Sequence, residues 1–300
     1  RKAGSHIISK SAHIVVNAEG GKPVLSDESL KMVHEQVGPD RSLLLVDATG
    51  RRRLLSNLLD VPSRAGGRSD TVLFAHIEGA DTTMLGNIHI GRLTHGWNWF
   101  IPLLDRMSAG IVMDDAKLKE YGDSNDERYD HLLSTEPALT RYLSNSKRLS
   151  PVTKYNNYQW VSNQLVGDGW ALVGDAAGFV DPVFSSGLYL GMDGAAKLAD
   201  AILEGRQDSM KRYEAGYFAH IEAWQRIVDL YYSGHLFTLF ITGRDNPPKW
   251  YSRPFRAHVY RHMGRVFTGQ AGTDRYSLRL LNFVTKYAIK SKNVEDLKIN

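Results

Sequence analysis

The chain has 300 residues, of which 42% are hydrophobic and 23% charged, with a net charge of +4 and no cysteine. This apolar content supports a packed core and argues against a disordered chain. The lack of cysteine excludes thiol nucleophiles, disulfides, cysteine-ligated zinc and iron–sulfur clusters. Because no apolar run reaches the roughly 18 residues that span a bilayer and no signal peptide opens the sequence, we expect a cytoplasmic protein without a membrane span.

The first half of the sequence is rich in strand signals. An apolar run over 41–47 is followed by a glycine-containing turn, which predicts a buried strand. Four strand-like stretches between 71 and 111 are separated by Gly and Asp, which predicts a meander of sheet. The polar segment 114–150, interrupted by Pro137, predicts short helices.

The second half alternates one strand with helices. A buried strand at 170–173 precedes a glycine-bearing turn and a helix from about Ser186 to Leu203. Apolar residues at three- and four-residue spacing predict a long amphipathic helix from Ser209 to about His235. Pro247-Pro248 is an expected break before a basic C-terminal part.

The basic part, residues 241–300, holds 12 Lys/Arg against 4 Asp/Glu. Its cations are spaced singly, as at Arg261 and Arg265, without a nucleic-acid-binding motif. We therefore expect a solvated surface and no nucleic-acid partner, and note that such a surface would also suit an acidic protein partner. His258 and His262 are four residues apart, but without an intervening carboxylate they indicate a structural or solvent-exposed pair, so we expect no metal site.

Several common signatures are missing: the sequence has no GxGxxG, no GxxxxGK[ST], no GxSxG and no HExxH. The richest segment is instead Gly169 to Asp200, GWALVGDAAGFVDPVFSSGLYLGMDGAAKLAD. Its small residues allow close backbone approach, and the helix that starts near Ser186 directs free N–H groups toward what precedes it. An Asp at the end of a buried strand is placed to bind a sugar-like hydroxyl. The alternative is a packed Gly/Ala turn with a well-capped helix.

In this segment the chain resembles the flavin-dependent halogenases of the tryptophan and pyrrole type, a branch of the p-hydroxybenzoate hydroxylase-like flavoproteins. The resemblance implies that FAD is the cofactor and that Asp175 hydrogen-bonds its ribityl chain. It also implies halide binding at the backbone N–H groups of Ser186 and Gly187. The FAD contacts implied in this segment are Gly174, Asp175, Ala176, Ala177, Pro182, Ser185, Ser186, Gly187 and Leu188.

Two further motifs support the resemblance. The turn DATGR is similar to a family turn close to the cofactor and adds Asp47, Ala48, Gly50 and Arg51 as expected FAD contacts. The sequence WNWFIP fits the WxWxIP pattern of halogenases, which implies a catalytic role for Trp97, Trp99 and Pro102. Without the resemblance, alternating strand aromatics with one buried face explain the two indoles equally well.

The resemblance covers roughly residues 35–205. The family's N-terminal GxGxxG part is missing from this sequence, and no lysine here can be assigned the role of the family's lysine. Since position 1 is Arg, we expect a chain cut upstream. The expected fold is α/β with α+β elements, an incomplete FAD-binding doubly wound domain with an inserted antiparallel substrate-side sheet and a C-terminal helical lobe. The expected boundaries are 1–65 and 160–205 for FAD binding, 66–159 for the sheet and 206–300 for the helical region.

The resemblance implies an oxidoreductase of natural-product (antibiotic) biosynthesis that uses reduced flavin, O2 and halide to halogenate an electron-rich aromatic. Its expected partners are a separate flavin reductase and an aromatic substrate, free or tethered to a carrier protein. Two alternatives remain open. One is an FAD-dependent monooxygenase or geranylgeranyl-reductase-like enzyme, and the other is a truncated partner-binding module without flavin.

Overall fold

The computed structural model describes residues 5–17, 21–39, 43–80, 86–93, 95–143, 145–156, 158–245, 249–269, 274–288 and 294–299. The chain divides into two compact units. Unit 1 contains Arg1–Arg64, Trp160–Phe179 and Ser185–Ile221, and unit 2 contains Ala65–Gln159, Val180–Phe184 and Glu222–Asn300. The mixture of helix and sheet agrees with the α/β class with α+β elements that the sequence predicts.

Unit 1 is built from short strands, and one pair of them is parallel. Its sheets are β1-β2, β12-β13-β3, in which β13 and β3 are parallel, and β14-β11-β4. The predicted strands at 41–47 and 170–173 are confirmed as β3 and β13. The elements are β1 (Ile14–Val16), β2 (Pro23–Leu25), α1 (Asp27–Val37), β3 (Leu45–Asp47), η1 (Gly50–Arg52), α2 (Leu54–Leu58), β4 (Ser63–Ala65), β11 (Trp160–Ser162), β12 (Val166–Gly167), β13 (Trp170–Leu172), η3 (Gly174–Ala176), β14 (Gly178–Phe179) and α6 (Ser186–Glu204).

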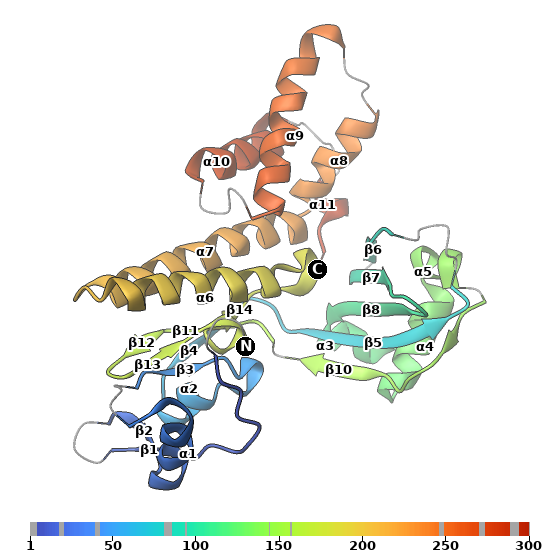
Figure 1. Cartoon of the computed structure of the whole chain (residues 1–300). Helices are drawn as coiled ribbons and strands as arrows, with labels where there is room; N and C mark the ends of the chain where they lie inside the picture. Colours follow the sequence, from blue (N-terminus) through green and yellow to red (C-terminus); the bar gives the residue numbers. More distant parts are fainter. Residues whose placement is uncertain are drawn as a thin grey trace. The chain divides into compact units, whose positions relative to one another are not determined.

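Helix α6 lies beside α7 (Ser209–Tyr232) (Figure 1). The predicted helix from Ser186 is confirmed, and so is the start of the helix at Ser209. The expected extension of that helix to His235 is wrong, because Gly234 has a φ of 78°, outside the helical range, and His235 begins α8. The predicted apolar stripe of α7 is buried from Tyr213 to Tyr231.

Unit 2 contains an antiparallel sheet in the order β10-β5-β8-β7-β6, with β9 also paired to β5. Strands β6, β7 and β8 form the predicted meander, whereas β5, the first strand of the predicted set, pairs with β8 and not with β6. Pro137 begins a helix, in agreement with the predicted interruption, whereas Pro247-Pro248 lies outside the described residues. The sheet and its helices are β5 (Asp70–Glu78), β6 (His89–Leu93), β7 (Gly96–Pro102), β8 (Met107–Asp114), α3 (Asp115–Leu118), η2 (Lys119–Tyr121), α4 (Asn125–Thr135), α5 (Pro137–Leu143), β9 (Lys147–Arg148), β10 (Thr153–Asn156) and η4 (Pro182–Phe184).

One face of this sheet forms a hydrophobic core with α3, α4 and α5. The Tyr129 hydroxyl of α4 donates a 2.9 Å hydrogen bond to the Ala109 carbonyl of β8 and fixes the helix on the sheet. Helix α4 begins with a capping box, in which Ser124 and Glu127 satisfy each other's backbone N–H groups. These contacts explain why a sequence as polar as 114–150 folds into short helices.

The C-terminal part of unit 2 is helical. The rings of His258 and His262 lie 4.5 Å apart and bond to α10, with His262 Nδ1 2.7 Å from the Ser277 hydroxyl and His258 Nε2 2.8 Å from the Tyr276 hydroxyl. The pair therefore joins two helices. The helices are α8 (His235–Asp245), η5 (Trp250–Ser252), α9 (Arg253–Phe267), α10 (Arg275–Phe283), η6 (Val284–Ala288) and α11 (Val294–Leu297).

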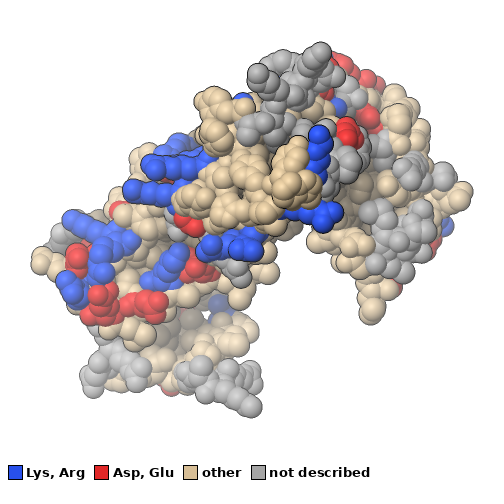
Figure 2. Space-filling model, turned by 90° about the horizontal axis from the view of Figure 1, so that it is seen from above, with Lys and Arg blue, Asp and Glu red and all other residues tan. Residues whose placement is uncertain are grey.

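The surface charge is mixed. On the face seen from above, Lys and Arg groups alternate with Asp and Glu groups and with uncharged residues (Figure 2). In the part of the chain that the structure describes, no helix is long and apolar enough to cross a membrane.

Two glycines on the paired helices α6 and α7 give a matched test of this packing. A Cβ at Gly194 would overlap the ring of Tyr217, whereas a Cβ at Gly216 would meet no atom within 4 Å. We expect Gly194→Ala to lower the free energy of unfolding by about 1–3 kcal/mol through overpacking. Gly216→Ala should raise it by up to about 1 kcal/mol through helix propensity. Urea unfolding measures both, and equal effects of the two variants would contradict the packing.

Candidate functional site

Two turns that are far apart in the sequence lie at one edge of a unit 1 sheet. The parallel register pairs Leu172 with Asp47, so β3 and β13 end side by side. The chain continues from β3 into Ala48–Arg51 and from β13 into Gly174–Ala177. Because ligands of parallel sheets bind outside the carboxyl ends of the strands, this edge is the candidate site in unit 1.

The first turn is held by Asp47, which is 3% exposed. Its Oδ1 accepts hydrogen bonds from the backbone and hydroxyl of Thr49 at 2.8 and 2.6 Å, and its Oδ2 accepts one from the Leu55 N–H at 2.8 Å. The carboxylate is thus engaged inside the turn and shapes the path of Ala48–Arg51. Gly50 has a φ of 64° and open space where a Cβ would be, so the turn presents bare backbone.

The second turn is held by two tyrosines of α7. The Tyr213 hydroxyl donates to the Leu172 carbonyl at 2.7 Å, and the Tyr217 hydroxyl donates to the Gly174 carbonyl at 3.5 Å. Gly174 has a φ of 63°, and a Cβ there would lie 3.7 Å from the Gly191 Cα of α6. Helix and turn therefore approach each other backbone to backbone.

Asp175 follows Gly174 and is partly exposed. Burial raises the pKa of its carboxyl, and the charge of the nearby Arg51 opposes that rise. Asp175 of the second turn and Arg51 of the first are thus close enough to interact. Ala176 and Ala177 are completely buried, so they act on this edge only through the packing of the turn.

Helix α6 begins without a side-chain cap. Ser185, the residue before it, has a φ of 52° in the left-handed region, which is unfavourable for a non-glycine residue. Ser186 is buried, and a Cβ at Gly187 would lie 3.1 Å from the Phe179 ring. Leu188 is 78% exposed, so a large apolar side chain is uncovered at the N-terminal end of α6. Uncapped N–H groups beside small residues form a surface suited to an anion or to a polar ring edge.

The tryptophans of β7 belong to unit 2. Trp97 is buried and Trp99 partly buried, with ring centroids 5.7 Å apart on one face of the sheet. Trp99 lies across Gly110, where a Cβ would overlap its ring, and its Nε1 donates to Ser108 Oγ at 3.2 Å. The motif ends at Pro102, the last residue of β7.

A buried polar network holds Trp97, and the sequence analysis does not predict it. The indole N–H donates to the Tyr232 hydroxyl at 2.8 Å, and this hydroxyl donates to Asp181 Oδ2 at 3.0 Å. Gln159 Nε2 also donates to Asp181 Oδ2, at 2.9 Å, and the Val183 N–H donates to Oδ1 at 2.9 Å. The Asp-Pro pair before Val183 was the only available signal, since Trp97 and Tyr232 are 135 positions apart.

Comparison with known proteins assigns the family. Residues 27–251 match the model of the tryptophan halogenase family. The chain belongs to this family. Tryptophan 2-halogenase of Chondromyces crocatus is 30% identical over 71% of this chain and 44% of that protein. The 1H-pyrrole-2-carbonyl-[peptidyl-carrier protein] chlorinase of Pseudomonas fluorescens is 26% identical over 76% of this chain and 52% of that protein.

Solved structures agree in fold with this halogenase family member. The flavin-dependent brominase Bmp2 superposes with a TM-score of 0.67 at 22% identity, covering 84% of this chain and 64% of that one. A flavoprotein/dehydrogenase from Cytophaga hutchinsonii superposes with a TM-score of 0.68 at 23% identity, covering 82% of this chain and 62% of that one. The chain spans about half the length of the curated relatives it matches.

Adjacent tyrosines test the Trp97 network. Tyr232→Phe removes the hydroxyl that bridges Trp97 and Asp181, so we expect the free energy of unfolding to fall by about 1–3 kcal/mol. Tyr231 is also buried, but its hydroxyl has no hydrogen-bond partner among the described residues. Tyr231→Phe should therefore leave the stability within about 0.5 kcal/mol of the wild type or raise it. Urea unfolding measures both, and a larger loss for Tyr231→Phe would refute the assignment.

The network also predicts a pH dependence. Burial raises the pKa of Asp181 to about 7, while its hydrogen bonds oppose the rise. At pH values between the ordinary carboxyl pKa and 7, Asp181 keeps its proton in the folded state but has lost it in the unfolded state. The free energy of unfolding therefore falls as the pH rises, by at most about 1.4 kcal/mol per pH unit. We expect this slope to be lost in Asp181→Asn and kept in Asp200→Asn, an exposed position of α6. Parallel stability curves for wild type and Asp181→Asn from pH 5 to 7 would contradict it.

Proposed function

We propose that the protein is an FAD-dependent halogenase that uses O2 and halide to halogenate an electron-rich aromatic substrate. The observation that carries the proposal is the meeting of two turns, 48–51 and 174–177, at one sheet edge in a member of the tryptophan halogenase family. Several relatives are themselves named flavin-dependent halogenases. One solved neighbour, PltM, is described in complex with FAD.

The residues at this edge fit a flavin. Gly50 and Gly174 expose backbone at positive φ, so an extended cofactor can approach closely. Asp175 offers a carboxylate to the ribityl hydroxyls, and the Arg51 side chain lies near it. The remaining contacts of the proposal are Asp47, Ala48, Ala176, Ala177, Pro182 and Ser185 to Leu188, with Asp47 and the two buried alanines acting through the shape of the turns.

The start of α6 has a separate role. The N–H groups of Ser186 and Gly187 carry the positive end of the helix dipole and would hold halide and stabilise negative charge on a ring edge. Bound FAD supplies the redox chemistry with O2, and the chain's own residues position it and exclude water. In unit 2, Trp97, Trp99 and Pro102 are proposed to border the reacting aromatic. We propose FAD binding for 1–65 and 160–205, the substrate side for 66–159 and a helical region for 206–300.

The partners belong to the same proposal. A separate reductase would deliver reduced FAD. One relative is named for a pyrrole substrate carried by a peptidyl-carrier protein and another for tryptophan, so a tethered or free aromatic substrate is proposed. The proposed location is the cytoplasm. The proposed role is in a natural-product pathway, and one relative, the tetracycline 7-halogenase of Kitasatospora aureofaciens, is named for such a product.

The test is product formation. The protein is incubated with FAD, a flavin reductase, NADH, O2 and an indole or pyrrole carboxylate, with and without bromide or chloride. We expect a halogenated product, detected by mass spectrometry, that requires halide. A hydroxylated product would assign the monooxygenase alternative. In a parallel incubation with a geranylgeranyl compound as substrate, reduction of its double bonds would assign the reductase alternative.

Two aspartates provide the matched variants. Asp175→Asn should weaken FAD binding by about tenfold, the effect of losing roughly 1.4 kcal/mol of hydrogen bonding. Asp200→Asn, at an exposed position of α6 outside the proposed FAD contacts, should bind FAD as the wild type does. Flavin fluorescence measures both affinities. Absence of flavin binding by the folded wild type would instead support a partner-binding module.

A further inference from the structure

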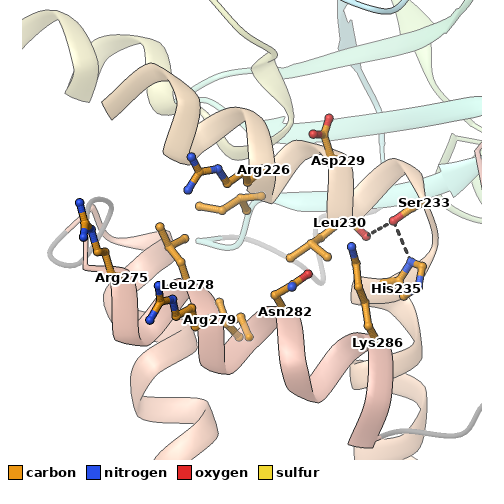
Figure 3. Close-up of a pocket in the computed structure, with 12 residues that line it drawn as sticks. Arg226, Asp229, Leu230, Ser233, His235, Arg275, Leu278, Arg279, Asn282 and Lys286 are labelled. Carbon is orange, nitrogen blue, oxygen red and sulfur yellow. Dashed lines mark hydrogen bonds between the residues drawn. The ribbon is translucent and has the colours of Figure 1, made fainter. Parts of the chain in front are cut away.

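A hollow of about 580 Å³ opens among the helices of unit 2 (Figure 3). Its walls come from the C-terminal half of α7, the start of α8, α10 and η6. Pockets of 300–1,000 Å³ are typical for small-molecule ligands. The residues that line it are Arg226, Ile227, Asp229, Leu230, Ser233, His235, Arg275, Leu278, Arg279, Leu281, Asn282 and Lys286.

The interior of the hollow is aliphatic. Ile227 and Leu281 are 1% and 2% exposed and form part of the core between α7 and α10. Leu230 and Leu278 are half-buried and direct their side chains into the space between the two helices (Figure 3). An apolar body of a ligand would gain about 25 cal/mol for each Å² that these side chains remove from water.

The rim of the hollow is cationic. Arg226, Arg275, Arg279 and Lys286 are exposed side chains that line it. Arg226 lies 3.6 Å from Glu222, whereas the other three have no ion-pair partner in the described part of the chain. Four like charges around one hollow repel one another, and apolar walls strengthen the field that they produce. An anion placed among them would relieve this repulsion.

The acidic residue of the lining does not neutralise the rim. The carboxylate of Asp229 points away from α10 (Figure 3) and accepts a 2.9 Å hydrogen bond from Gln225 Nε2. Lys286 and His235 lie toward one end of the hollow, and Arg226 and Arg275 toward the other (Figure 3). The Asn282 amide lies between them and adds a neutral polar group. The hollow therefore combines an aliphatic floor, formed by the leucine and isoleucine side chains of its interior, with a positively charged rim.

We propose that this hollow binds a small amphipathic anion, a carboxylate with an aliphatic or aromatic body. Charge complementarity with the rim selects the carboxylate, and the leucines and isoleucine accept the apolar body. The site lies wholly within unit 2 and uses none of the residues assigned to flavin or halide. It is thus separate from the proposed halogenation site, and its test does not depend on activity.

The test uses octanoate, octylammonium, 1-octanol and butyrate as probes, with binding measured by calorimetry in the presence of saturating FAD. Octanoate should bind more tightly than each of the others, because only octanoate combines the negative charge with a body long enough for the floor. Rising salt should weaken the binding of octanoate and leave that of 1-octanol unchanged.

Paired charge reversals locate the site. Arg275→Glu/Arg279→Glu should weaken octanoate binding by at least about tenfold, which corresponds to about 1.4 kcal/mol, and leave 1-octanol binding unchanged. Arg253→Glu/Arg261→Glu changes the net charge equally at exposed positions of α9 outside the lining, and should bind octanoate as the wild type does. Circular dichroism confirms that both variants are folded.

Three results would overturn the proposal. Equal weakening by the two double variants would assign octanoate binding to net charge. Equal affinity for octanoate and octylammonium would assign it to nonspecific apolar adsorption. Failure of octanoate to bind would refute the proposal, and binding of an acidic amphipathic helical peptide, or a change in oligomeric mass of the Arg275→Glu/Arg279→Glu variant, would then assign the hollow to a protein partner.

Discussion

The parallel pairing of β3 with β13 is the constraint on which the unit 1 site depends. It places the end of β3 beside the end of β13, although these strands are more than a hundred residues apart in the sequence. Asp47 then shapes one turn through its own carboxylate, and Tyr213 and Tyr217 hold the other through the carbonyls of Leu172 and Gly174. Loss of the pairing would separate the two turns, whatever their individual conformations.

Much of this edge could be predicted from the sequence because its signals are local. A buried apolar run followed by glycine predicts a strand and a turn, and both 41–47 and 170–173 follow that rule. The helix after Ser186 follows from small residues and a regular apolar period. The end of α7 could not be placed in this way, because the apolar period continues past the Ser-Gly break into α8.

The polar contacts were beyond prediction because they join residues that only the tertiary structure brings together. Neither the bond from Trp97 to Tyr232 nor that from Tyr232 to Asp181 has a spacing or composition signal. The same holds for the role of Asp47, whose carboxylate supports the turn from inside. The cationic hollow likewise assembles Arg226 of α7 with Arg275 and Arg279 of α10, whose sequence shows only scattered charges.

The indole pair of β7 has a spectroscopic consequence. Trp97 and Trp99 have ring centroids 5.7 Å apart and planes inclined by 45°, and hydrogen bonds to Tyr232 and Ser108 restrict both rings. Chromophores at this separation and inclination couple their electronic transitions, which gives rise to circular dichroism in the aromatic ultraviolet. The halogenase-type motif thus contains an intrinsic optical reporter of the order of its own sheet.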